Sequence, residues 1–244
     1  MLELVEVIKK ILPLNWFYKD QDIQNHPGAK NLEKFRGLVK KNNYREKDDL
    51  LLKELNIVVL DTETTGLKPH AGDEIISVGA CLIRDGEVLP EGFNKLVNPF
   101  KPIPRFITEL TGINDEMVAE AEDFYTVMCD FLDFLKDNII VGHSIEFDIN
   151  FFNYKLKPLN IKINNYLIDT GILSKALNPH IKLHTLDSIV ASMDINPDGR
   201  HTALGDALLT AGVFLNFQKQ LEDLRINTLF DLRCYVKNAM LYRF

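Results

Sequence analysis

Two acidic residues stand two positions apart at the end of an apolar run that is typical of a buried strand. The run Ile57–Leu60 is followed closely by Asp61 and Glu63. Side chains at positions i and i+2 of a strand project from the same face. Ionised carboxylates are costly to bury unless positive charge compensates them. Two carboxylates on one face can bind a cation between them, and the alternative is an ordinary surface strand that carries exposed acids.

A third acid lies within an apolar and aromatic stretch, VGHSIEFDINFF. Asp148 is flanked there by Phe147 and Ile149, and two more phenylalanines follow. An acid with such neighbours is not expected to face bulk water freely. A helix N-cap is the alternative role, because aspartate is favoured at that position. Capping alone does not account for Glu146, which stands only two residues earlier.

A histidine and a fourth acid occur close together in the stretch GRHTALGDALLTA. His201 and Asp206 are five residues apart, so one ideal helix would place them about 140° apart around its axis. The preceding Pro197-Asp198-Gly199 instead predicts that His201 lies on a loop and Asp206 in the first turn of the next helix. That arrangement suits a proton carrier beside a metal ligand. A loop histidine without a role is the alternative.

As an ordered set, these three sites resemble the motifs of the DnaQ-like 3′–5′ exonucleases of the DEDDh type. The resemblance extends over roughly Asn56–Phe217. Within it, Ile107–Ile113 is similar to the family's stretch beside the terminal nucleotide, and Leu183–Asp187 is similar to its lead-in to the third motif. Ser144 departs from the pattern, because relatives often have asparagine there. The resemblance implies an α/β fold, a ribonuclease-H-like mixed β-sheet flanked by helices.

The resemblance also implies the roles of five residues. Asp61, Glu63, Asp148 and Asp206 are expected to bind metal, and His201 is expected to be the general base. Oxygen ligands without cysteine favour Mg²⁺ or Mn²⁺ over zinc. Two such divalent cations can stabilise the charge that develops when a phosphodiester is hydrolysed, with nucleoside 5′-monophosphates as products. We expect Asp61 to be shared by both ions, Glu63 and Asp206 to complete the nucleophile-side ion, and Asp148 to support the leaving-group side.

Four further residues are candidates for holding the terminal nucleotide, with packing or turn formation as the alternative role. They are Thr64, Thr65, Thr111 and Phe147.

The elements that must position these residues follow from hydrophobic periodicity and turn signals. Asp85-Gly86 between two apolar runs predicts a β-hairpin. Residues 1–55 are expected to form a helical N-terminal extension, residues 56–217 the exonuclease domain, and residues 218–244 a helical C-terminal tail. Within the domain, strands are expected at 57–60, 75–83, 87–97, 138–141 and 166–168, and helices at 124–136, 149–156, 183–192 and 203–217.

Composition and charge narrow the class of protein. No apolar run approaches the ~20 residues of a membrane-spanning helix, and we expect no membrane partner. The three cysteines, Cys81, Cys129 and Cys234, are far apart and odd in number, which favours free thiols in the cytoplasm. The formal net charge is −7, yet seven of the residues from Lys30 to Lys47 are basic. This segment is either a solvated helix face or a basic patch beside a nucleic-acid groove.

The leading hypothesis is a metal-dependent exonuclease that acts on single-stranded or frayed DNA 3′ ends in proofreading or repair, with a DNA polymerase subunit as a candidate partner. An RNA-trimming exoribonuclease is the first alternative, because the motifs surround the phosphate and do not read the 2′-hydroxyl. A non-catalytic module that binds 3′ ends or a polymerase is the second. It is disfavoured because all five catalytic residue types are present.

Overall fold

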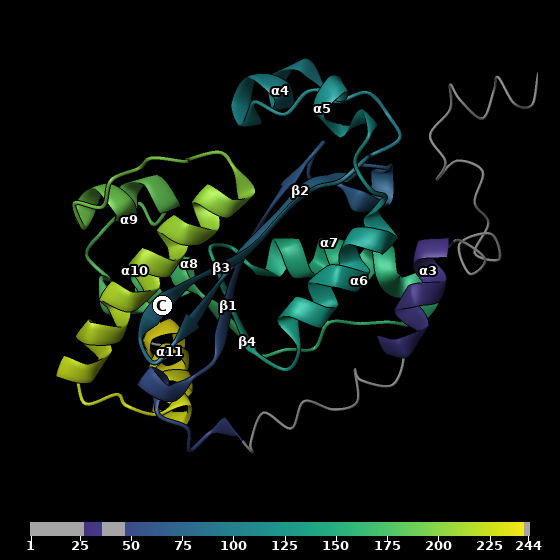
Figure 1. The fold of residues 1–244 in the computed structure, drawn as a ribbon. Coiled ribbons are helices and arrows are strands. Elements are labelled where there is room, and N and C mark those ends of the chain that lie inside the picture. The colour runs from purple at the N-terminus through teal and green to yellow at the C-terminus, as the bar shows by residue number, and fades with distance from the viewer. Residues whose placement is uncertain (1–26, 36–46, 242–244) are drawn as a thin grey trace, which may run out of the picture.

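The computed structural model describes residues 27–35 and 47–241, and within them the core is a five-stranded mixed sheet (Figure 1). The strand order is β3-β2-β1-β4-β5. The first three strands are antiparallel neighbours, whereas β4 and β5 run parallel to β1. The strands are β1 (Ile57–Thr64), β2 (Ile75–Arg84), β3 (Glu87–Leu96), β4 (Ile139–Gly142) and β5 (Leu167–Asp169).

Helices cover both faces of this sheet (Figure 1). One face carries α3, α6 and α7, and the other carries α8, α9, α10 and α11, while α4 and α5 lie at one end of the sheet. The α-helices are α3 (Pro27–Asn31), α4 (Arg105–Thr111), α5 (Asp115–Ala119), α6 (Phe124–Leu135), α7 (Glu146–Leu156), α8 (Thr170–Leu177), α9 (Leu186–Ser192), α10 (Ala203–Asp223) and α11 (Leu229–Leu241).

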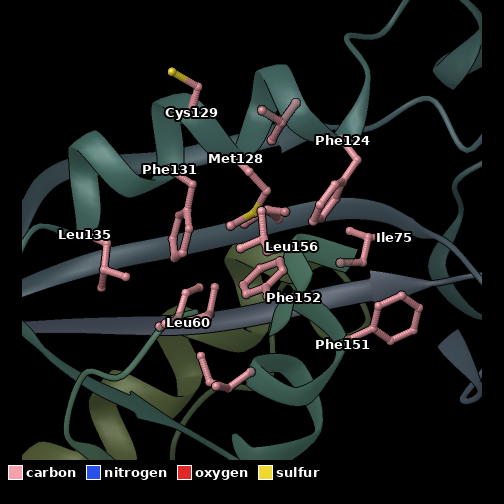
Figure 2. Packing of buried hydrophobic residues seen from close by; sticks show 14 of the residues in the cluster. Leu60, Ile75, Phe124, Met128, Cys129, Phe131, Leu135, Phe151, Phe152 and Leu156 are labelled. Atoms are coloured by element: carbon pink, nitrogen blue, oxygen red, sulfur yellow. The ribbon is translucent and has the colours of Figure 1, made fainter. Parts of the chain in front are cut away.

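The strand β1 lies in the middle of the sheet and divides its side chains between two hydrophobic clusters. Val58 and Leu60 belong to the cluster beneath α6 and α7, and Ile57 and Val59 belong to the cluster beneath α10. Figure 2 shows Leu60 among the aromatic side chains of the first cluster, where the rings of Phe131 and Phe152 lie 5.5 Å apart. All four β1 residues are buried, so the backbone that carries Asp61 and Glu63 is held firmly from both sides.

The predicted fold class is confirmed, and the strands and helices predicted within the domain are present with shifted ends. β1 continues from the apolar run 57–60 through Asp61 and Glu63 to Thr64, and α10 continues past residue 217 to Asp223. The hairpin at Asp85-Gly86 joins β2 to β3. α11 contacts α8, with Tyr235 Oη donating a hydrogen bond to the Ala176 carbonyl. The boundaries 1–55, 56–217 and 218–244 stay predictions.

Most of the predicted N-terminal extension, residues 1–26 and 36–46, lies outside the described residues. The described part, α3 and the 3₁₀ turn Leu32–Phe35, packs on α6 with Leu32 and Phe35 buried. Of the basic segment, Lys34 pairs with Asp133 and Lys47 with Asp137. These pairs are typical of a solvated face. In the described ranges, no helix combines the length and the apolarity that crossing a membrane requires.

Candidate active site

The end of β1 that carries the two acids extends beyond its parallel neighbour. β1 pairs with β4 only as far as Val59, whereas its pairing with β2 continues along the whole strand. Asp61 lies opposite Gly79 of β2, and Glu63 lies opposite Ser77. The acids are therefore fixed on one side by the ladder to β2, while the other side is open where β4 has ended.

The helix α10 brings a third acid to the same place. Asp206 lies in the first turn of α10, whose N-cap is Thr202, and its side chain is buried. A Cβ atom added to Gly79 would lie 2.1 Å from the backbone nitrogen of Leu204. The start of α10 thus rests directly on β2 at the residue opposite Asp61, because a glycine leaves room for the helix backbone.

Ligand oxygens of Asp61, Glu63 and Asp206 all lie within 4.8 Å of one another. Burial raises the pKa of Asp61 well above its ordinary value, and repulsion from Asp148, Asp206 and Glu63 raises it further. Burial and the charge of Asp206 raise the pKa of Glu63 to about 7. Asp61 and Glu63 therefore ionise more readily once positive charge is supplied close to them.

The positive charge nearest to this cluster in the described chain comes from Arg200, on the loop before α10. Its Nη1 donates to Asp206 Oδ2, while Nε and Nη2 donate to the two carboxylate oxygens of Asp187 at 2.6 and 3.1 Å. The charge of Arg200 lowers the pKa of both Asp61 and Glu63, but burial and repulsion outweigh it. One guanidinium does not balance three acids.

The fourth predicted acid approaches from the opposite face of the sheet. Asp148 lies in the first turn of α7, is buried, and accepts a hydrogen bond of 2.5 Å from Thr62 Oγ1. Thr62 points away from Asp61 and Glu63, because side chains alternate along a strand. Burial raises the pKa of Asp148 to about 7. Asp148 therefore stands outside the group of three but close enough to repel Asp61.

The turn between β4 and α7 is held by residues at the end of β5 and the start of α8. Asp169 caps α8 and also accepts a hydrogen bond of 3.0 Å from the backbone nitrogen of Ile145. His143 Nδ1 lies 3.0 Å from Thr170 Oγ1, and burial lowers the pKa of this imidazole. Ser144 has φ 59°, in the left-handed region that asparagine adopts more readily than serine. The turn thus keeps its geometry although Ser144 departs from the family pattern.

His201 lies on the loop before α10, as its sequence context predicted. It is partly exposed and has φ 61°, a left-handed conformation that is uncommon for a non-glycine residue. Its charge contributes to lowering the pKa of Asp187, so the imidazole is close to the Asp187–Arg200 pair. A strained loop residue at the rim of the acidic cluster is a reasonable position for a proton carrier, and that role stays a prediction.

Four residues were predicted to hold the terminal nucleotide, and their side chains make local contacts. Thr64 Oγ1 donates to the carbonyl of Gly66, and Thr65 Oγ1 accepts from the backbone nitrogen of Glu74. Thr111 Oγ1 donates to the carbonyl of Ile107. The ring of Phe147 is partly buried and packs 5.9 Å from Phe151. These contacts explain the residues as turn and packing elements, and a substrate role stays a prediction.

The donor set fits a hard divalent cation. All the clustered ligands are carboxylate oxygens, which Mg²⁺ and Mn²⁺ prefer. Asp206 Oδ1 is buried and has no hydrogen-bond partner among the residues that the structure describes. A buried carboxylate oxygen without a partner is costly, and a metal ion would satisfy it.

A comparison with models of protein families identifies the family to which this chain is similar. The RNase T family model, described as an exonuclease, matches residues 58–214 and so includes β1, α7 and the start of α10. This chain belongs to that exonuclease family. The predicted resemblance to DEDDh enzymes is confirmed at this level, and so is the prediction of an exonuclease.

Individual relatives agree with the family. This exonuclease is 37% identical over 186 residues to a DNA polymerase III PolC-type protein of Thermotoga maritima, and 35% identical over 177 residues to the 3′-5′ exonuclease DinG of Bacillus subtilis. The matches cover 76% and 72% of this chain, but only 13% and 19% of those proteins. The chain therefore spans a small part of these curated relatives.

A solved structure shows the same fold. The nuclease domain of 3′hExo, a DEDDh family member bound to rAMP, superposes with a TM-score of 0.61 at 19% sequence identity. The match covers 71% of this exonuclease and 94% of that domain.

Two residues of the exonuclease site had not been singled out from the sequence. Arg200 could have been found from its place directly before His201, because a cation next to a predicted metal site is unusual. Gly79 carries no local signal, because its importance comes from α10, which starts more than a hundred residues later. Only the tertiary structure identifies it.

Proposed function

We propose that this exonuclease removes nucleotides one at a time from DNA 3′ ends with the help of two divalent cations, Mg²⁺ or Mn²⁺, and releases nucleoside 5′-monophosphates. The observation that carries the proposal is the clustering of Asp61, Glu63 and Asp206 within 4.8 Å, with more negative charge than one arginine balances. Phosphodiester hydrolysis needs positive charge at this kind of position.

The residues divide the work according to where they lie. Asp61, Glu63 and Asp206 would hold the ions, and Asp148 would support them from the α7 side. When bound, such ions stabilise charge on the attacking and leaving oxygens. His201 would accept the proton of the attacking water, because its loop is at the rim of the cluster and imidazole changes protonation near neutral pH.

The surface next to β1 suits a single-stranded end. Leu67 follows β1 closely and is 75% exposed, and Phe106 of α4 is 63% exposed. α4 packs through Ile107 on Ile76, the neighbour of the residue that pairs with Glu63. Exposed apolar side chains give unpaired bases a stacking surface without selecting a sequence. We place the terminal nucleotide here, near Thr64, Thr65, Thr111 and Phe147.

DNA is the proposed substrate because several relatives carry the name DNA polymerase III. A DNA polymerase subunit is accordingly the proposed partner, and the free thiols agree with a cytoplasmic setting. RNA is the second candidate, because the solved neighbour 3′hExo holds rAMP.

The test compares 5′-labelled single-stranded DNA and RNA of the same sequence, each with Mg²⁺, with Mn²⁺ and with chelator. We expect metal-dependent ladders that shorten from the 3′ end, faster on DNA. Asp61→Asn should abolish the ladder, whereas Asp85→Asn, the same change at the hairpin turn far from the site, should leave it intact. A faster RNA ladder would replace DNA by RNA. Intact strands in every lane, together with binding, would favour the non-catalytic module.

A further inference from the structure

Arg200 connects the acidic cluster to a carboxylate outside it. Its guanidinium bonds Asp206 through Nη1 and holds both oxygens of Asp187 through Nε and Nη2. The Arg200 side chain is 19% exposed, and that of Asp187 is 64% exposed. Arg200 therefore has one partner inside the site and one partner at its rim.

The two partners differ in what else could bind them. Asp206 belongs to the cluster of three acids whose oxygens lie within 4.8 Å, where a divalent ion would be bound. Asp187 lies at the start of α9 and does not belong to that cluster. An ion entering the cluster would thus compete with Arg200 for Asp206 while leaving the bidentate contact to Asp187 intact.

We propose that Arg200 is the resident counter-ion of the metal-free site, which a divalent cation must displace from Asp206, and that Asp187 retains the displaced guanidinium. This inference rests on the proposed function, because it requires that the three acids bind metal. It assigns a positioning role to a residue that touches neither water nor phosphate in the proposed reaction.

The charges around the site indicate that Arg200 competes with a metal ion and does not assist its binding. The positive charge of Arg200 acts on Asp61 and Glu63 as well as on Asp206. It therefore opposes the binding of a metal cation at all three carboxylates. When no metal ion is bound, the charge of Arg200 compensates part of the repulsion among Asp61, Glu63 and Asp206. Arg200 and His201 are consecutive, so a shift of the guanidinium toward Asp187 also adjusts the loop that carries the proposed base.

The experiment measures Mn²⁺ binding to the full chain by titration calorimetry, with circular dichroism to check folding. Arg200→Gln should bind Mn²⁺ at least about fivefold more tightly than the wild type, within the usual range of coupling between two sites. Asp187→Asn should bind it more weakly, because the guanidinium then loses one of its two carboxylate partners and is held more strongly by Asp206. Arg200→Lys keeps the charge and should not show the tighter binding of Arg200→Gln.

Arg84→Gln is the matched control. Arg84 bonds Asn56 at the opposite end of β2, so this variant changes the net charge equally without touching the site. Its affinity should equal that of the wild type. Equal or weaker binding by Arg200→Gln would overturn the inference and leave the proposed function standing. If the wild type binds no Mn²⁺ at all, the proposed function fails, and the inference fails with it.

Discussion

Two regions in the described part of the chain bury acidic side chains and differ in how their charge is balanced. Glu74, just before β2, is paired with Lys155 of α7; the Glu74 side chain is buried and that of Lys155 is 13% exposed. Burial raises the pKa of Glu74 while Lys155 opposes the rise. In the other region, Asp61, Glu63 and Asp206 share one guanidinium.

The difference separates a structural pair from a functional site. A buried pair with equal and opposite charges is complete within the chain, and removing one partner mainly costs stability. A cluster with surplus negative charge is complete only when cations arrive, so removing a group there should mainly cost activity. Both regions lie near the same end of β1, which makes them a fair comparison.

Among the variants that test this contrast, the largest effect is expected on the turnover number of His201→Ala. His201→Ala should lower the turnover number by ~10²–10⁴, the usual contribution of a general base, because the proposed proton acceptor is removed. The thermal unfolding midpoint should stay within a few degrees of the wild type, since the side chain is partly exposed. Single-turnover degradation of a labelled oligonucleotide with Mg²⁺ measures the rate. A variant that keeps more than half of the wild-type turnover would remove His201 from the mechanism.

The balanced pair should show the opposite behaviour. Lys155→Met leaves Glu74 buried without its counter-ion, and we expect a loss of about 3–5 kcal/mol in the free energy of unfolding. Urea denaturation measures this loss. The turnover of the protein that remains folded should change much less than in His201→Ala.

The double variant Glu74→Gln/Lys155→Met removes both charges and should recover most of the stability. If the double variant were as unstable as Lys155→Met, the loss would come from packing against Phe124, whose ring lies 5.6 Å from the Lys155 ammonium, and the contrast between the two regions would weaken.

The surplus charge should also appear in the pH dependence of the metal-free protein. The folded-state pKa of Glu63 is about 7 against an ordinary value of 4.5. An acid whose pKa is raised by folding stabilises the protein fully below the unfolded value, and this contribution is lost as pH rises through about 7. The difference amounts to about 3 kcal/mol at most. The free energy of unfolding in chelator should therefore fall from pH 4.5 to pH 8 more steeply in the wild type than in Glu63→Gln.

Divalent ions should reverse this loss. The ligands must be deprotonated to bind, so Mn²⁺ should raise the unfolding midpoint more at pH 8 than at pH 5.5. A midpoint that responds equally to Mn²⁺ at both pH values would show that the raised pKa values do not govern metal binding.

The parts of the fold and of the site that depend on local sequence signals could be predicted. The apolar run before Asp61 and the Asp85-Gly86 turn predicted the central strands, and alternation along a strand predicted that Asp61 and Glu63 share a face. The apolar run alone did not fix where the strand ends, because pairing with β2 carries β1 through Glu63 to Thr64.

Non-local relations could not be predicted in the same way. No sequence signal indicated that α7 brings Asp148 to β1 from the face opposite Asp61 and Glu63, where Thr62 donates a hydrogen bond to it, while its charge still acts on Asp61. The pairing of Glu74 with Lys155 joins residues 81 positions apart, and nothing in either local sequence indicates it.

The smallest effect is expected from a substitution that leaves every charge in place and moves only α10, the helix that carries Asp206. Gly79→Ala would put a methyl group 2.1–2.6 Å from backbone atoms of Ala203 and Leu204, so the start of α10 must shift. We expect a loss of about 1–3 kcal/mol in stability and about tenfold in turnover, because catalysis depends on ångström-level placement. Gly212→Ala, later in α10 where the nearest atom is 3.7 Å away, should instead be neutral or stabilising. Equal turnover in the two variants would show that the contact between the start of α10 and β2 does not set the geometry of the acidic cluster.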